Sequence, residues 1–78
     1  MYKVLKKYRV GNKYCVSVEG ESKLLRNGIN LRDEKGNLFT IESIGMVKYE
    51  DIKDYKKYAE MVLMGEVENI GEILNIVE

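Results

Sequence analysis

The chain has 78 residues, of which 45% are hydrophobic and 33% charged, and its formal net charge is zero. This composition is typical of a globular domain and excludes a disordered chain. A neutral chain has no overall field that would draw it to nucleic acid or to a membrane surface. No apolar run approaches the roughly 18 residues of a membrane span. We therefore expect one domain over residues 1–78 and no membrane partner.

The sequence contains one cysteine, Cys15, and no histidine. A single cysteine cannot form an internal disulfide, and zinc-binding Cys/His spacing is absent, so we expect no metal and no cofactor. A chain this short buries only about 60% of its unfolded surface, and small domains without such staples often depend on a partner subunit. The free thiol and the lack of a signal-peptide pattern favour a reducing cytoplasm.

Basic and acidic residues are distributed unevenly. Residues 1–14 contain five basic groups and no acidic one, whereas residues 60–78 contain five glutamates and no basic group. Two arrangements fit this pattern: the two ends pair and close a barrel, or the basic end forms a weak patch for an anionic ligand. Opposite charges on neighbouring strands are common in sheets, which favours the first arrangement.

The first 19 residues predict a β-hairpin. Residues 2–10 alternate, with Tyr2, Val4, Tyr8 and Val10 on one face and Lys6 as the exception. Residues 14–19 also alternate. The segment Gly11-Asn12-Lys13 between them predicts a tight turn, because Gly and Asn tolerate positive φ.

Residues 23–47 predict a β-meander. Turn signals at Asn27-Gly28 and at residues 33–37 flank a short strand over residues 29–32. In the next strand, residues 38–47, the apolar parity switches near Ser43. This switch predicts either a bulge or burial on both faces.

The remaining residues divide into a polar segment and two further elements. Residues 48–58 hold four lysines, three acids and three tyrosines, and their i, i+3 spacing fits either a short helical turn near 49–58 or a long surface loop. Residues 59–65 again alternate like a strand. Residues 67–77 fit a helix or a final strand; a mid-helix Gly71 would cost about 1 kcal/mol relative to alanine, so we favour the strand.

These elements predict an all-β fold, a small six- to seven-stranded β-barrel that is closed or partly open. Closure removes exposed sheet edges in a chain that is too short to cover them with helices.

Glycines and aliphatic residues at turn and core positions suggest a family of barrels. They are Gly20, Leu24, Leu25, Gly28, Ile29, Leu31, Phe39, Ile41, Ile44, residues 61–65, Gly71 and Leu74. Over residues 14–77 their order resembles domain 2 of the elongation-factor-Tu type, the small β-barrel of translation GTPases. The resemblance implies the fold. The chain has no phosphate-binding loop, and residues 14–18 replace the family's glycine-rich first strand, so no functional residue of the family is transferred.

Few residues are candidates for catalysis or metal binding. Cys15 lies in mid-strand without a histidine to activate it, so we interpret it as a structural thiol. We interpret Asp33-Glu34 as a solvated turn rather than a cation site or an acid/base pair. The acids of residues 50–54 alternate with lysines, which favours a self-paired loop over a metal site. The sequence therefore predicts a protein that is not an enzyme.

The segment 48–58 is the best candidate for an interaction site, because tyrosines are enriched at interfaces and lysines beside aromatic rings can contact phosphates. The alternative is a surface segment whose tyrosines pack against the barrel. The predicted interaction residues are Tyr49, Lys53, Tyr55, Lys56, Lys57 and Tyr58.

Two functions follow from this candidate site. The first is a non-enzymatic binding or accessory module that contacts another protein, or a copy of itself, through residues 48–58. The second is association with RNA or the ribosome, in which the basic N-terminal strand acts together with Lys53, Lys56 and Lys57. Affinity of the second kind should fall steeply with salt.

Overall fold

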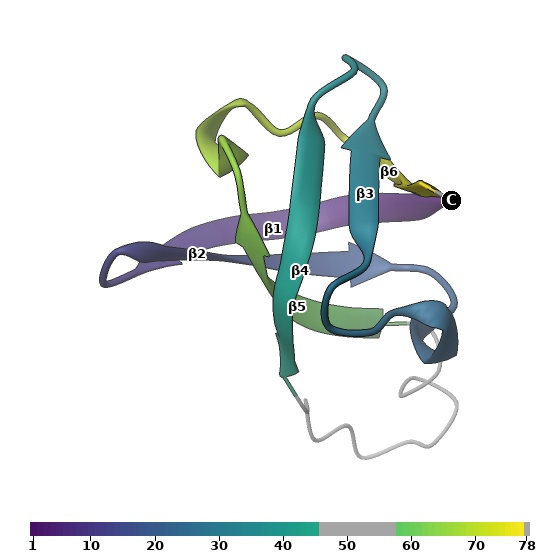
Figure 1. Cartoon of the computed structure of the whole chain (residues 1–78), viewed down its shortest axis with the longest axis horizontal. Coiled ribbons are helices and arrows are strands. Elements are labelled where there is room, and N and C mark those ends of the chain that lie inside the picture. The colour runs from purple at the N-terminus through teal and green to yellow at the C-terminus, as the bar shows by residue number, and fades with distance from the viewer. Residues whose placement is uncertain (46–57, 78) are drawn as a thin grey trace.

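The computed structural model describes residues 1–45 and 58–77, and these form a closed antiparallel β-barrel (Figure 1). Six strands follow the order β1-β2-β5-β4-β3-β6 around the barrel, and β6 returns to β1. The strands are β1 (Tyr2–Val10), β2 (Lys13–Glu19), β3 (Asn30–Asp33), β4 (Leu38–Gly45), β5 (Tyr58–Met64) and β6 (Ile73–Val77), and two 3₁₀ turns are η1 (Ser22–Leu24) and η2 (Val67–Asn69).

The predicted fold class is confirmed: the barrel is all-β and closed, with six strands. The tail is a strand preceded by the single turn η2, as the β-branched residues favoured, and not a helix. The helical turn predicted near 49–58 lies outside the described residues, except for Tyr58, which begins β5.

The first hairpin forms as predicted, but a bulge in β1 changes which side chains of the strand face the core. The register with β2 shifts between Val4 and Lys6. Tyr2 and Val4 therefore point to the core side, whereas Tyr8 and Val10 lie on the outer face. The prediction that all four share one face was wrong, because one extra residue reverses the parity of the rest of the strand.

The parity switch in β4 is also a bulge. The register between β4 and β5 shifts between Ile41 and Ser43, so Glu42 is the extra residue. Ile41 and Ile44 both contact the core as a result. A bulge lets the strand bend as the sheet closes into a barrel.

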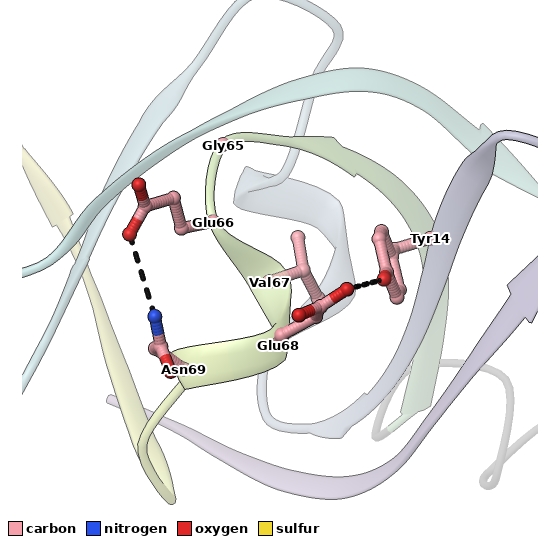
Figure 2. A pocket seen from close by; sticks show the side chains of 6 residues that line it. All are labelled: Tyr14, Gly65, Glu66, Val67, Glu68 and Asn69. Carbon is pink, nitrogen blue, oxygen red and sulfur yellow. Dashed lines mark hydrogen bonds between the residues drawn. The ribbon is translucent and has the colours of Figure 1, made fainter.

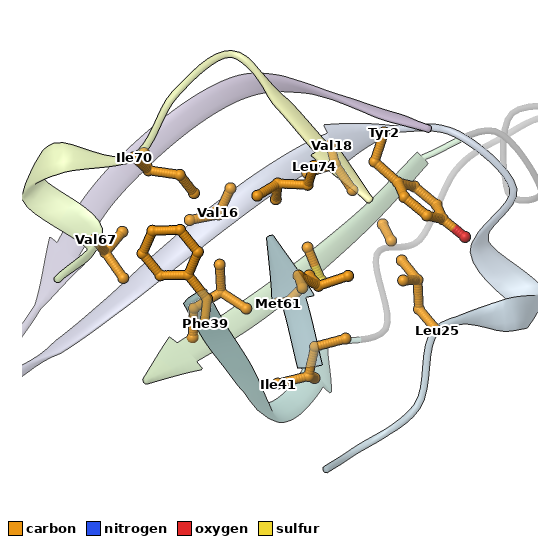
Figure 3. Packing of buried hydrophobic residues seen from close by; sticks show 13 residues of the cluster. Tyr2, Val16, Val18, Leu25, Phe39, Ile41, Met61, Val67, Ile70 and Leu74 are labelled. Carbon is orange, nitrogen blue, oxygen red and sulfur yellow. The ribbon is translucent and has the colours of Figure 1, made fainter. Parts of the chain in front are cut away.

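The barrel interior is filled by the chain's own side chains (Figure 3). Phe39, Val67 and Ile70 lie together toward one end, and Tyr2 and Leu25 lie toward the other. The Tyr2 hydroxyl donates a hydrogen bond of 2.8 Å to the carbonyl of Glu21, which satisfies the polar end of this core residue. The buried core consists of Tyr2, Val16, Val18, Leu25, Leu31, Phe39, Ile41, Ala59, Met61, Leu63, Val67, Ile70 and Leu74.

The two ends of the chain pair as predicted, but not through their charges. β6 joins β1 at Tyr2 and Lys3. The ion pairs within the described residues are Lys13–Glu42 and Lys23–Glu21, and neither links the basic end to the acidic end. Backbone pairing therefore closes the barrel.

Asp33 and Glu34 hold the segment that leads into β6, an arrangement we call the Asp33–Glu34 clamp. Asp33 is only 4% exposed. Its carboxylate accepts hydrogen bonds from the backbone N–H groups of Lys35 (3.0 Å), Asn37 (2.7 Å) and Gly71 (2.9 Å), and from the Asn37 side chain (3.0 Å). The expectation of a solvated turn was wrong for Asp33, because the buried N–H of Gly71, from a distant segment, needs this acceptor.

Glu34 completes the clamp at the start of β6. Its carboxylate accepts hydrogen bonds from the N–H groups of Glu72 (2.8 Å) and Ile73 (3.0 Å). A Cβ at position 71 would collide with this carboxylate, so glycine is needed for the close approach.

Hydrogen bonding keeps both clamp carboxylates ionised. Burial raises the pKa of Asp33, but the hydrogen bonds from Asn37, Gly71 and Lys35 outweigh it and leave the pKa below the usual 3.8. The hydrogen bonds from the backbone of Glu72 and Ile73 hold the pKa of Glu34 below the usual 4.5.

We expect Asp33→Ala to lower the free energy of unfolding by about 2–3 kcal/mol, because it leaves buried backbone donors without an acceptor. Urea denaturation followed by circular dichroism measures this change. Glu42→Ala is the matched control, since it removes an exposed carboxylate with one ion pair and should cost less than about 1 kcal/mol. Equal losses in the two variants would contradict the structural role of Asp33.

We also expect acid to weaken the barrel. A carboxyl group whose pKa is depressed by folding stabilises the protein above its unfolded pKa, and this contribution is lost as pH falls through the folded value. The urea midpoint should therefore fall steeply below about pH 4. In Asp33→Asn the fall over this range should be shallower than in the wild type, and parallel curves would contradict the assignment.

Candidate functional site

Most of the interaction site predicted from sequence lies outside the described residues. This applies to Tyr49 and Tyr55 and to the three lysines Lys53, Lys56 and Lys57, and their roles stay predictions. Tyr58 is half-buried at the start of β5, opposite Glu19 of β2. Tyr58 is therefore part of the barrel wall, beside the last residue of β2.

On the outer face, Tyr8 lies between a cation and a carboxylate. Lys6 Nζ is 5.4 Å from the centroid of the Tyr8 ring, and the Tyr8 hydroxyl donates a hydrogen bond to Glu60 Oε1. This hydrogen bond, followed by burial, raises the pKa of Tyr8 to about 12. Tyr8 therefore keeps its proton at neutral pH and is unsuited to act as a base.

Apolar side chains continue from Tyr8 across the outer face. The register places Tyr8 opposite Cys15 and Cys15 opposite Val62. Met64 lies two residues after Val62 in β5 and therefore on the same face. Met64 pairs with Thr40 of β4, and Leu38, two residues before Thr40, shares this face as well. We call these five residues, from β1, β2, β5 and β4, the outer apolar strip; they are Tyr8, Cys15, Val62, Met64 and Leu38.

The outer apolar strip is exposed at one end and half-buried at the other. Met64 is 50% exposed and Leu38 56% exposed, and the other three members are half-buried. Lys13 and Glu42 stand on the strands to either side of β5, and their 2.7 Å ion pair spans it. The ion pair therefore crosses the strip over β5, the strand that carries Val62 and Met64, so the strip is an apolar surface interrupted by one pair of opposite charges.

A pocket of about 400 Å³ opens at one end of the barrel, between Tyr14 and the residues of turn η2 (Figure 2). Buried Val67 forms its apolar part. The Tyr14 hydroxyl donates to Glu68 Oε1, and Asn69 Nδ2 donates to Glu66 Oε2 over 3.3 Å. The pocket therefore presents an aromatic ring and two carboxylates, each of which accepts a hydrogen bond through one oxygen.

The β1–β2 hairpin brings two cations to this mouth. Lys7 Nζ donates to the backbone carbonyl of Glu68 over 2.8 Å. The Arg9 guanidinium carbon lies 5.9 Å from the centroid of the Tyr14 ring. The hydrogen bond to Glu68 raises the pKa of Tyr14, and the charge of Arg9 opposes that rise.

Cys15 is the one cysteine of the chain. Cys15 faces Tyr8, which holds its proton, and the sequence has no histidine to serve as a base. In residues 1–45 and 58–77 no group of three His, Cys, Asp or Glu side chains could hold a metal ion. Sequence patterns missed the outer apolar strip because the β1 bulge reverses the face of Tyr8, and missed the pocket because Tyr14 and Glu68 are far apart in the chain.

Neither family models, nor curated proteins, nor solved structures give a match to this chain. Among the helices of the described residues, none has the length and apolar character needed to cross a membrane.

Proposed function

We propose that this protein is a non-enzymatic binding module whose partner is a second copy of the same chain, docked on the outer apolar strip. The observation that carries the proposal is the strip itself, where exposed Leu38 and Met64 continue the half-buried row of Tyr8, Cys15 and Val62. Exposed apolar side chains that form a contiguous patch mark interaction surfaces, whereas single ones are ordinary.

The charges around the strip favour self-association. Glu60 and Lys6 lie beside Tyr8 at one end of the strip, and the Lys13–Glu42 ion pair crosses the strip over β5. A two-fold contact places the same surface on both subunits, so a surface that carries both signs can be complementary to itself. The chain has no net charge, and two copies therefore do not repel each other at long range.

The size of the domain supports the same conclusion. A 78-residue chain with a single cysteine gains stability when a partner covers apolar surface. In this proposal the segment 48–58, with Tyr55 and Tyr58, is a second contact region. The free thiol of Cys15 fits a location in a reducing cytoplasm.

We expect Met64→Lys to weaken self-association at least about tenfold, because it places a charge in the apolar centre of the contact. Sedimentation equilibrium over a range of concentrations measures the dimer dissociation constant. Leu24→Lys is the matched control, since Leu24 in η1 is 52% exposed but does not belong to the strip. A wild type that stays monomeric at high micromolar concentration, or a control that weakens dimers equally, would overturn the proposal.

RNA association is the second candidate, and a cluster of cations on β1 favours it. Lys3, Lys6, Lys7 and Arg9 are all exposed on this strand, and Lys6 lies over the ring of Tyr8. Cations beside an aromatic ring are the usual means of holding single strands. The resemblance to translation-protein barrels supports the same reading.

For this candidate we expect a fluorescent oligouridine to bind at 50 mM salt and to be released by 200 mM. The slope of log K against log [salt] should be about −0.7 for each phosphate contacted. Fluorescence anisotropy gives this slope, and Lys6→Gln should reduce it. Absence of binding at the lower salt would remove RNA from consideration.

A further inference from the structure

Half of strand β1 has an edge without a neighbouring strand. β6 pairs with β1 at Tyr2 and Lys3, and the Val4 N–H donates to the carbonyl of Glu72 over 2.7 Å. Within the described ranges, the rest of β1 pairs on one side only, with β2. Figure 1 shows the turn of the β1–β2 hairpin extending beyond the other strands, and turn η2 approaches this edge at Lys7, whose Nζ donates to the carbonyl of Glu68.

The hairpin turn fixes which backbone groups face the open edge. Val10 and Lys13 are partners around the two-residue turn Gly11-Asn12, and the pair that closes such a turn is hydrogen-bonded. Bonded and non-bonded pairs alternate along an antiparallel ladder. The N–H and C=O groups of Arg9 and Lys7 therefore point away from β2, toward the open edge.

The side chains along this edge are basic. Lys6, Lys7 and Arg9 are all exposed, and neither ion pair within the described residues, Lys13–Glu42 or Lys23–Glu21, involves them. Lys7 Nζ donates to the backbone carbonyl of Glu68, and Arg9 Nε donates to that of Gly11. Antiparallel pairing of two β1 edges would place these cations opposite one another, which is unfavourable. The charge pattern thus excludes a second copy at this edge and favours an acidic strand.

We propose that residues 5–10 of β1 bind an extended, acidic segment of a partner protein, which adds to the sheet as a further strand. The backbone groups of Lys7 and Arg9 supply the hydrogen bonds, and the three cations supply the preference for glutamate or aspartate. A polypeptide offers donors and acceptors at the two-residue spacing of the edge, whereas RNA does not. This site differs from the outer apolar strip, which lies on the face of the sheet rather than at its edge.

The test uses a labelled eight-residue peptide in which glutamate alternates with threonine, and follows its anisotropy on addition of the full-length protein. We expect saturable binding that weakens about tenfold when alternate peptide nitrogens are methylated, because methylation removes the donors to the edge. Replacement of glutamate by glutamine should weaken binding by a similar factor. Equal affinity of the methylated peptide, or no binding at 1 mM peptide, would overturn the proposal.

Variants of the protein separate the edge from general charge attraction. Lys7→Pro removes an N–H group at the open edge without removing a hydrogen bond to β2. It should therefore weaken peptide binding more than Lys7→Gln does. Thermal melting checks that both variants are folded. The double variant Lys7→Glu, Arg9→Glu should no longer bind the acidic peptide. It should bind a peptide in which lysine replaces each glutamate. Oligouridine that binds more tightly than the peptide and with the same dependence on Lys7 would overturn the proposal in favour of RNA.

The same peptide also distinguishes this inference from the self-association proposed above. Met64→Lys should leave peptide binding unchanged, because Met64 lies on β5 and does not contribute to the edge of β1. Loss of peptide binding in Met64→Lys would contradict a separate edge site, whatever the effect of this substitution on dimerisation.

Discussion

The carboxylate of Asp33 holds the segment through which the backbone pairing of β6 closes the barrel. It lies at the end of β3, where the turn to β4 begins, and it reaches the segment that leads into β6. Because β6 is the strand that joins β3 to β1, the position of that segment decides whether the sheet closes. Glu34 extends the same support to the first residue of β6. A buried charge is tolerated here because four donors surround it.

Two bulges then decide which side chains the barrel shows to solvent. The bulge in β1 moves Tyr8 and Val10 outward, and the bulge in β4 lets Ile41 and Ile44 both reach the core. Without the first bulge, Tyr8 would lie on the core side, and the outer apolar strip would begin at Cys15. The interaction surface thus follows from local irregularities in an otherwise regular fold.

Much of the fold could be predicted from sequence because period-2 alternation and glycine turns are local signals. The hairpin 2–19, the parity switch near Ser43 and the final strand were all readable in this way. The β1 bulge could not be predicted, since its only signal in the sequence is Lys6, which interrupts the apolar pattern. The burial of Asp33 could not be predicted either, because its partner Gly71 is 38 residues away and short-range patterns carry no record of such a contact. The candidate surfaces depend on register between strands, which explains why sequence directed attention to residues 48–58 instead.

The distance along the chain between the two halves of the clamp also has a kinetic consequence. Hairpins such as β1–β2 join neighbouring residues and form in microseconds, whereas a contact across 38 residues must first overcome the entropy of closing a large loop. The strands on either side of Asp33 can therefore pair before β6 is in place, and the clamp is completed late. A late contact does little to speed folding, but it must break early when the barrel opens. A change at Asp33 is therefore expected to alter the rate at which the barrel unfolds more than the rate at which it folds.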